Sequence, residues 1–330
     1  MPELTNLGHI DRALTNISVA YMQTADAYIA DKVFPVIGVK QQSDVYYKYS
    51  KADFFRNEVQ ERGRAAESAG GTWNMELADP YHCRKYAYHY DITQEEKVNY
   101  DQPINVDRDT TEWLTEKMLL KREVDFTTKF FKTGVWGKDI AGAAAADATH
   151  CLKFSNQLSD PVKIVTDQML VMAENAGVKP NFLIMAPDVF YALKNHESIM
   201  DRIKYTQKGI ITLDLIASLF EVENIYIPWG IYNAGPSTPG YDEVKTSMNF
   251  LYKGSMLLGY RVKSPSLKKP TAGYIFAWNG IEGTQNAYGS RMVRIKMDML
   301  GLGTERLEME MAYDQKVICS DMGVFFSALV

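Results

Sequence analysis

The sequence has few cysteines, no long apolar run and no excess of positive charge. Its 330 residues include three cysteines, Cys83, Cys151 and Cys319. An odd number so widely spaced does not form a disulfide framework, and it suits a reducing compartment. No signal-peptide pattern follows Met1, and no apolar run approaches the roughly 18 residues of a membrane helix. These absences predict a protein that folds in a cytoplasm and has no membrane partner.

The charge balance and the missing motifs argue against several classes of function. The formal net charge of −5 gives no basic field of the kind that dedicated nucleic-acid-binding proteins carry. There is no P-loop, no Gly-x-Gly-x-x-Gly and no Gly-x-Ser-x-Gly motif. The pairs His82-Cys83 and His150-Cys151 come nearest to a metal site, but their spacing matches no zinc pattern. We therefore expect no catalytic residue, no metal and no cofactor, with an α/β enzyme of unrecognised site as an alternative.

The clearest single element is a helix predicted over Asp109–Thr133. Asp109 and Glu112 have the spacing of a capping box, and Gly134 suits the position after the last turn. Apolar side chains fall on two adjacent stripes at helical spacing. One stripe holds Trp113, Leu120, Val124 and Phe131, and the other holds Leu119, Phe126 and Phe130. A helix of about seven turns with two apolar faces predicts a spine against which other elements pack.

Helices and strands alternate after this helix. Asp160-Pro161 opens a helix that ends at Gly177, with proline at its first position. The elements expected next are a strand at 182–185, a helix from Pro187 to about Asn195, a helix at 212–220 and a strand at 225–227. A loop rich in glycine and proline, Trp229–Tyr241, closes the series. The pattern predicts a separate α/β unit.

A charged segment, Lys51–Gly71, lies between two strand-like blocks at 45–49 and 73–77, and a third block alternates over Tyr86–Ile92. The charges of this segment balance and it is poor in apolar residues. A loop this long is uncommon in a compact domain unless it has a function or is disordered. Two interpretations stay open. It is either a mobile surface loop or a long hairpin whose tip becomes ordered against a neighbouring subunit.

The strongest β signal is a hairpin near the C-terminus, over residues 291–313. Val293, Ile295 and Met297 alternate with charged residues, as do Leu307, Met309 and Met311, and Gly301-Leu302-Gly303 lies between the two runs. If the two runs fold back about Leu302, each charged residue lies across from one of opposite charge. Each apolar residue then lies across from another apolar residue. The predicted register pairs Lys296 with Glu308, Arg294 with Glu310, Asp298 with Arg306 and Ile295 with Met309.

The order of these features resembles that of the major capsid proteins of tailed bacteriophages, which have the Hong Kong 97-type fold, over nearly the whole chain. The run Tyr28–Val36 looks like the end of the N-terminal arm that leads into the extended loop of those proteins. The helix at Asp109–Thr133 looks like their spine helix. The passage Gly177–Asp188 looks like the helix–strand–helix passage of their axial domain.

This resemblance implies an α+β fold with an N-arm, an extended β-hairpin loop, a peripheral domain with a spine helix on a long β-sheet, and an axial α/β domain. The boundaries it suggests are 1–35 for the arm, 36–95 for the loop, 96–160 and 271–330 for the peripheral domain, and 161–270 for the axial domain.

The function that the resemblance implies is a virion structural protein, assembled in the host cytoplasm into pentamers, hexamers and an icosahedral shell. Its partners would be other copies of itself, a separate scaffolding protein, a portal, decoration proteins and double-stranded DNA held without sequence readout. An encapsulin-like nanocompartment shell is the alternative with the same fold. The residues expected at intersubunit contacts are Arg56, Glu58, Glu61, Arg62, Arg64, Glu67, Trp229 and Tyr232.

Overall fold

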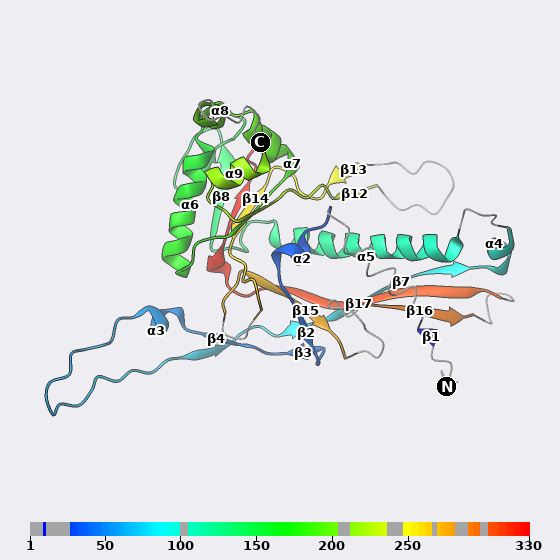
Figure 1. Cartoon of the computed structure of the whole chain (residues 1–330), viewed down its shortest axis with the longest axis horizontal. Coiled ribbons are helices and arrows are strands. Elements are labelled where there is room, and N and C mark those ends of the chain that lie inside the picture. Colours follow the sequence, from blue (N-terminus) through cyan, green and yellow to red (C-terminus); the bar gives the residue numbers. More distant parts are fainter. Residues whose placement is uncertain are drawn as a thin grey trace.

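A computed structural model describes residues 9–10, 27–99, 105–203, 212–235, 247–265, 269–280, 290–297 and 303–330. Figure 1 shows an elongated sheet with one long helix lying along it, an α/β unit standing at one end, and a loop that projects away from the body. The arm before residue 27, apart from the short strand β1 (His9–Ile10), lies outside the described residues. The turn at Gly301-Leu302 and residues 236–241 of the Trp229–Tyr241 loop also lie outside them.

The elongated sheet is organised around one strand of 13 residues, β17 (Glu305–Val317). Its antiparallel neighbours are β16 (Arg291–Lys296), β7 (Arg84–Ile92) and β15 (Gly273–Trp278). Strand β1 extends the sheet beyond β16, and β2 (Val36–Val39) pairs in parallel with β15. We call this the β17 sheet. Because β17 joins segments from distant parts of the sequence, the sheet cannot form before most of the chain is present.

The predicted C-terminal hairpin is confirmed, but its predicted register is wrong. Lys296 lies opposite Glu305, not Glu308, and Arg291 lies opposite Glu310. Met292 therefore faces Met309, on the side of the sheet that carries the long helix, where both are buried. The prediction failed because β16 has apolar residues of both parities, Met292 as well as Val293. Helix α5, which packs on one face of the sheet, determines that Met292 and not Val293 points toward it.

The long helix α5 (Val106–Phe130) confirms the predicted spine, three residues earlier at each end than expected. Its N-cap is Asn105, whose side chain accepts a hydrogen bond from the Arg108 amide at 3.1 Å, so the expected capping box at Asp109 was wrong. The stripe with Leu119 and Phe126 is buried, whereas Trp113 on the other stripe is 40% exposed. One predicted apolar face therefore packs on the core and the other is only partly covered.

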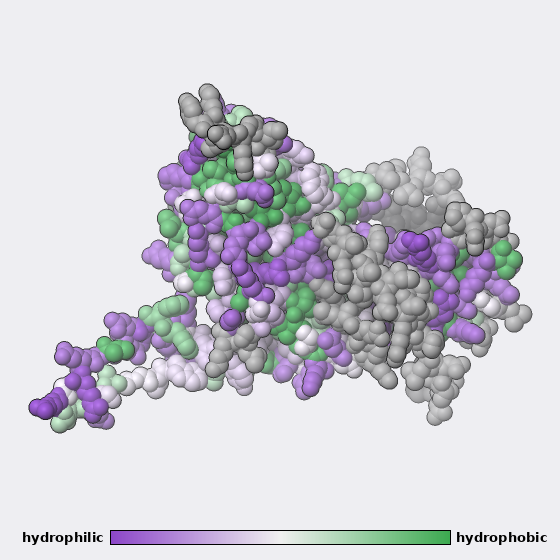
Figure 2. Space-filling view, viewed as in Figure 1, coloured by the Kyte–Doolittle hydropathy of each residue, from purple (hydrophilic) through white to green (hydrophobic). Residues whose placement is uncertain are grey.

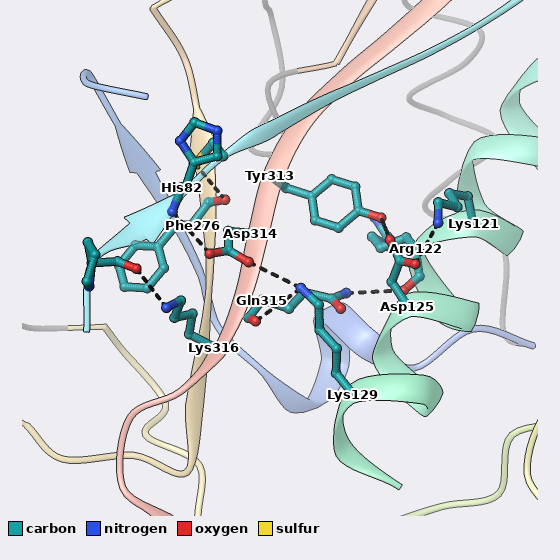
Figure 3. A network of polar contacts seen from close by, with 12 residues as sticks. His82, Lys121, Arg122, Asp125, Lys129, Phe276, Tyr313, Asp314, Gln315 and Lys316 are labelled. Atoms are coloured by element: carbon teal, nitrogen blue, oxygen red, sulfur yellow. Dashed lines mark hydrogen bonds and ion pairs between the residues drawn. The ribbon is translucent and has the colours of Figure 1, made fainter. Parts of the chain in front are cut away.

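Polar contacts fix α5 to the β17 sheet, as Figure 3 shows. The Tyr313 hydroxyl donates to Asp125 at 2.9 Å, and the Gln315 amide donates to the Arg122 carbonyl at 3.1 Å. Lys129 pairs with Asp314 at 3.2 Å, and the other oxygen of Asp314 accepts from the His82 amide at 3.1 Å. One carboxylate thus ties the helix, the sheet and the strand β6 (Tyr81–His82) together.

A buried carboxylate on α5 joins the segment before β2 to the α/β unit. Glu123 is 0% exposed and accepts from the amides of Ile29 and Ala30, each at 3.1 Å, at the start of α2 (Ala30–Val33). It also accepts from the hydroxyl of the buried Tyr252. Burial raises the pKa of Glu123, although the hydrogen bonds to it act in the opposite direction. A buried acid stays in place only because its acceptors are used in this way.

The α/β unit has a second six-stranded sheet, which we call the β10 sheet. Its strand order is β11-β10-β14-β18-β8-β9. The strands are β11 (Asn224–Tyr226), β10 (Phe182–Met185), β14 (Met256–Gly259), β18 (Gly323–Ser327), β8 (Lys138–Ala143) and β9 (His150–Leu152). Its helices are α6 (Pro161–Ala176), α7 (Pro187–Lys194), α8 (Glu197–Ile203) and α9 (Leu213–Leu219).

The helices and strands predicted for this unit are confirmed, including the start of α6 at Asp160-Pro161 and its end at Gly177, which has φ +70°. The β10 sheet is nevertheless wider than the predicted range 161–270, because β8, β9 and β18 come from outside it. Strand β10 is buried along its whole length, as expected for a central strand. The division of the chain into domains at the predicted boundaries stays a prediction.

Replacement of Glu123 by glutamine tests the buried carboxylate. The NH2 group of glutamine would replace one carboxylate oxygen and so present a donor to the amide of either Ile29 or Ala30, which is itself a donor. We expect the free energy of unfolding to fall by about 1–3 kcal/mol, the usual cost of leaving buried donors unsatisfied. Urea unfolding followed by circular dichroism measures this. The control is Glu112→Gln on the same helix, whose partner is Arg108 and whose loss should cost about 0.5 kcal/mol or less.

The acids of the β17 sheet predict a loss of stability in acid. Hydrogen bonds from Lys97 and Arg294 hold the pKa of Glu305 below the ordinary glutamate value of 4.5, and the Arg306 guanidinium lowers that of Asp91. Burial acts to raise the pKa of Glu310, but Arg291 and Lys85 outweigh it and lower the pKa. A lowered pKa means stability that is present above the unfolded value and lost as pH falls through the folded value.

We therefore expect the unfolding free energy to decrease as pH falls below 4.5, the unperturbed glutamate value. Glu123, whose pKa is raised, acts in the opposite direction and offsets part of this loss. Urea midpoints between about pH 3 and pH 7 measure the slope. Glu305→Gln should flatten it, and an unchanged slope in that variant would contradict the assignment.

Candidate intersubunit surfaces

The projecting loop, residues 47–77, is a hairpin without a second layer. Strand β4 (Tyr47–Tyr49) pairs with β5 (Met75–Leu77), and β3 (Ser43–Asp44) pairs with β6 where the loop leaves the body. Between the strands lie one short helix, α3 (Lys51–Phe55), and extended chain. Figures 1 and 2 show the loop standing clear of the body. A two-stranded hairpin of this kind is at best marginally stable alone.

Large apolar side chains of the loop are exposed, and the register of β4 on β5 places Tyr49 and Met75 on the same face of the hairpin. Val59 is 91% exposed, Leu77 70% and Phe54 63%. The others that are exposed are Tyr47, Tyr49, Phe55, Trp73 and Met75. The alternation at 73–77 predicted a strand, and β5 forms there with all three of its residues exposed. Several large apolar residues exposed together mark an interaction surface, so a partner is the expected cover.

The six charged residues predicted as contacts all lie on this loop and are exposed. Arg56 pairs with Glu58 at 3.0 Å, and Arg62 donates to the Ala66 carbonyl at 2.6 Å. No ion pair is found for Glu61, Arg64 or Glu67 among the described residues. Exposed pairs contribute only about 0–1 kcal/mol. The contacts among these charges therefore add little to the internal stability of the loop.

A second exposed apolar surface lies on the α/β unit, away from the loop. Trp229 is 48% exposed and its ring contacts the rings of Tyr191 and Phe250, each at 6.1 Å between centroids. The adjacent hairpin of β12 (Ile231–Asn233) and β13 (Met248–Phe250) exposes Ile231, Met248 and Phe250. We call these residues the Trp229 surface. Tyr232 lies on β12 opposite Asn249 and is half-buried.

The sequence predicted Trp229 and Tyr232 but missed Tyr191, Met248 and Phe250. Tyr191 belongs to helix α7 and Phe250 comes after the Gly/Pro-rich loop, so they meet Trp229 only through the fold. The alternation of Met248 and Phe250 around Asn249 was the one available signal. The predicted contact residues therefore fall into two separate groups, the loop and the Trp229 surface, as their positions in Figure 1 indicate.

The His-Cys pairs do not form a reactive or metal-binding site in the described chain. Burial raises the pKa of the Cys83 thiol to about 12, which keeps it protonated and weakly nucleophilic. His150 contacts Asp147 at 2.8 Å, while the adjacent Cys151 is buried. No cluster of three or more His, Cys, Asp or Glu side chains suited to a metal ion is found among the described residues.

An open groove of about 700 Å³ lies between the α6–β10 loop and the chain after β14. Four of its charged residues form two ion pairs, Lys179 with Glu221 at 2.7 Å and Lys263 with Glu223 at 3.0 Å. Within the residues that the structure describes, no helix has the length and apolar composition that crossing a bilayer requires.

Comparison with curated proteins gives two relatives, although no family model matches the chain. The major capsid protein of Burkholderia phage BcepMu is 27% identical over 238 residues, which cover 70% of this chain and 73% of the relative. The major capsid protein of Pseudomonas phage JBD67 is 24% identical over 232 residues, 66% of this chain and 68% of the relative.

Solved structures share the fold at lower identity. A phage-related protein of Bordetella bronchiseptica RB50 aligns over 98% of this chain and 99% of its own, with a TM-score of 0.71 and 18% identity. The mature capsid of bacteriophage PhiM1 gives a TM-score of 0.54 at 9% identity, covering 88% of this chain and 84% of that chain. The SrpI encapsulin of Synechococcus elongatus gives 0.52 at 12% identity, covering 99% and 92%. With its mixed α+β fold, the chain is related to the major capsid proteins of tailed phages, as the order of its sequence features predicted.

Proposed function

We propose that this chain is a shell subunit that closes into pentamers and hexamers and then into an icosahedral shell around phage double-stranded DNA. The two sequence relatives, both major capsid proteins, support this proposal. The fold shared with the PhiM1 capsid agrees with it. The work of such a subunit is binding to copies of itself, so the relevant chemistry is that of its exposed surfaces and not of a catalytic pocket.

The observation that carries the proposal is the projecting loop. It exposes eight large apolar residues, Tyr47, Tyr49, Phe54, Phe55, Val59, Trp73, Met75 and Leu77, and it has no layer beneath it. A monomer gains nothing from this arrangement, because exposed apolar area costs free energy in water. Against an adjacent subunit the same residues would be buried, and Glu61, Arg64 and Glu67 would find ion-pair partners. The loop is therefore a part that needs a neighbour.

The Trp229 surface would be the second contact, close to the symmetry axis of the capsomer. Aromatic side chains at the centre of an interface contribute most of its binding energy. Repetition of both contacts around a ring and over a closed lattice provides stability that no single contact can.

The remaining assignments follow from this role. The subunit would act as a structural protein without catalytic activity, assembled in the host cytoplasm and retained in the virion. Its other partners would be a separate scaffolding protein, a portal and decoration proteins. The DNA would be held without sequence readout, which requires no strongly basic chain and agrees with the net charge of −5.

The encapsulin alternative shares the fold, as the similarity to the SrpI encapsulin indicates. The sequence relatives favour the phage assignment. Negative-stain microscopy and nuclease treatment of native particles separate the two. DNA protected inside closed particles supports the phage shell, a protein cargo supports a nanocompartment, and a stable monomer would contradict both.

Removal of residues 56–70 tests the need for the loop. The subunit should still fold, since this segment packs on no core element, and its unfolding free energy should change by about 1 kcal/mol or less. Closed particles should be lost. Circular dichroism with urea unfolding measures the first property, and sedimentation with electron microscopy measures the second.

A matched control replaces residues 56–70 by a Gly/Ser segment of equal length. This variant keeps the reach of the loop but removes its side chains, so particle loss in both variants assigns the effect to the side chains. A deletion variant that no longer folds would count against the overlap of subunits, because the segment would then be needed within its own chain.

Trp229→Ala tests the second surface. Trp229 is half-exposed, so the truncation should lower the unfolding free energy by only about 0.5–1.5 kcal/mol, while an interface anchor costs about 2 kcal/mol or more in association. We expect the protein concentration needed for assembly to rise at least about tenfold. Light scattering against concentration measures this, with the exposed Leu170→Ala on α6 as the control. Equal assembly by both variants would remove Trp229 from the interface.

A further inference from the structure

Helix α3, which follows β4 within the projecting loop, contacts the α/β unit of its own chain. A hollow of about 290 Å³ separates α3 from the C-terminal end of α6. It is lined by Lys51, Ala52, Phe55, Glu174, Asn175 and Gly177. Because α6 packs on the β10 sheet while α3 belongs to the loop, this contact connects the loop to the α/β unit at a point away from the β3–β6 strand pair.

The first contact is an ion pair. The Lys51 ammonium lies 2.7 Å from the Asp321 carboxylate, in the turn Ser320–Met322 that precedes β18. Their side chains are 49% and 37% exposed. Exposed pairs are weak and are screened by salt, so the contact opens easily.

The second contact places an aromatic ring on a glycine. A Cβ atom at Gly177 would lie 2.7 Å from Cζ of Phe55, so the ring occupies the space that a side chain would need. Gly177 has φ +70°, which also favours glycine there. Phe55 remains 68% exposed. The contact with Gly177 therefore covers only part of the Phe55 ring. The ring can leave Gly177 without exposing any core residue.

Hydrogen bonds connect helix α3 to the chain on both sides of the loop. The Ser50 amide donates to the Asn74 carbonyl at 3.1 Å, and the Asn74 amide donates to the Asp53 carboxylate at 3.0 Å. The chain that enters the loop is thus fixed to the chain that returns. The position of α3 on the α/β unit therefore sets the direction in which the whole loop projects.

We propose that α3 is a reversible latch within one chain, in which Lys51 on Asp321 and Phe55 on Gly177 hold the projecting loop at one angle to the α/β unit. Two weak, solvent-accessible contacts suit a device that opens and closes, whereas a permanent joint would be buried. The latch fixes the direction of the loop before a neighbouring subunit binds. Less conformational entropy is then lost on association. The role of the latch in assembly rests on the proposed shell function, whereas the contacts that form it do not.

The distance between two spin labels in the dilute, unassembled full-length chain tests the latch. One label is placed through Ser68→Cys in the loop and the other through Leu170→Cys on α6, in a Cys319→Ser background because Cys83 and Cys151 are buried. We expect one narrow distance peak. Lys51→Asp should abolish that peak in favour of a broad distribution, and the double exchange of Lys51→Asp with Asp321→Lys should restore it.

Two controls make the result specific. Lys163→Asp breaks the exposed Lys163–Asp167 pair on α6 and should leave the peak unchanged. A mixture of labelled Lys51→Asp chains with unlabelled Asp321→Lys chains can restore the pair only between copies, so the distribution should stay broad. A peak unaffected by Lys51→Asp, or restored by the mixture, would overturn the latch within one chain.

Assembly is measured separately on the same variants by light scattering. An absence of particles from the unsubstituted chain would contradict the shell function while the label distances still decide the latch. If the distance measurement contradicts the latch, the deletion of residues 56–70 still tests the shell function.

Discussion

The buried face of helix α5 is the constraint on which the rest of the structure depends. Glu123 on that helix is fully buried and accepts hydrogen bonds from the chain before β2 and from Tyr252 of the α/β unit. On the same helix, Asp125 and Lys129 hold β17. Loss of the donors to Glu123 would leave a fully buried carboxylate unpaired, which costs more than the bonds themselves contribute. The helix therefore fixes two sheets and one chain segment with respect to each other.

The projecting loop has the opposite physical character. Its ion pairs are exposed, its apolar residues are uncovered, and its attachments to the body are the short β3–β6 strand pair and the contacts of α3. The body is thus held by buried hydrogen bonds and the loop by exposed contacts. The difference arises from burial, because hydrogen bonds and ion pairs are strong only where water is excluded.

The sequence predicted elements well where one local pattern was decisive. Asp160-Pro161 and Gly177 fixed both ends of α6, since a cap, a proline and a left-handed glycine act within a few residues. It misplaced the start of α5, because Asn105 and Asp109 are both acceptable caps and local chemistry does not choose between them. For the candidate surfaces, Trp229 was identified, whereas Tyr191 was missed because it belongs to a distant helix.

By itself, the sequence determined the charged loop, the relation to phage capsid proteins, the helices α5, α6, α7 and α9, and the strands β4, β5, β7, β10, β11, β16 and β17. Each of these follows from local periodicity or from the order of elements. The tertiary structure alone decided the register of β16 on β17. Met292 and Val293 can each face a core, and only α5, with Asp107 at 3.3 Å from Arg294, selects the first. It also decided which strands complete the β10 sheet and where Lys51 and Phe55 rest, since these pairings join residues far apart in the sequence, for which no local pattern exists.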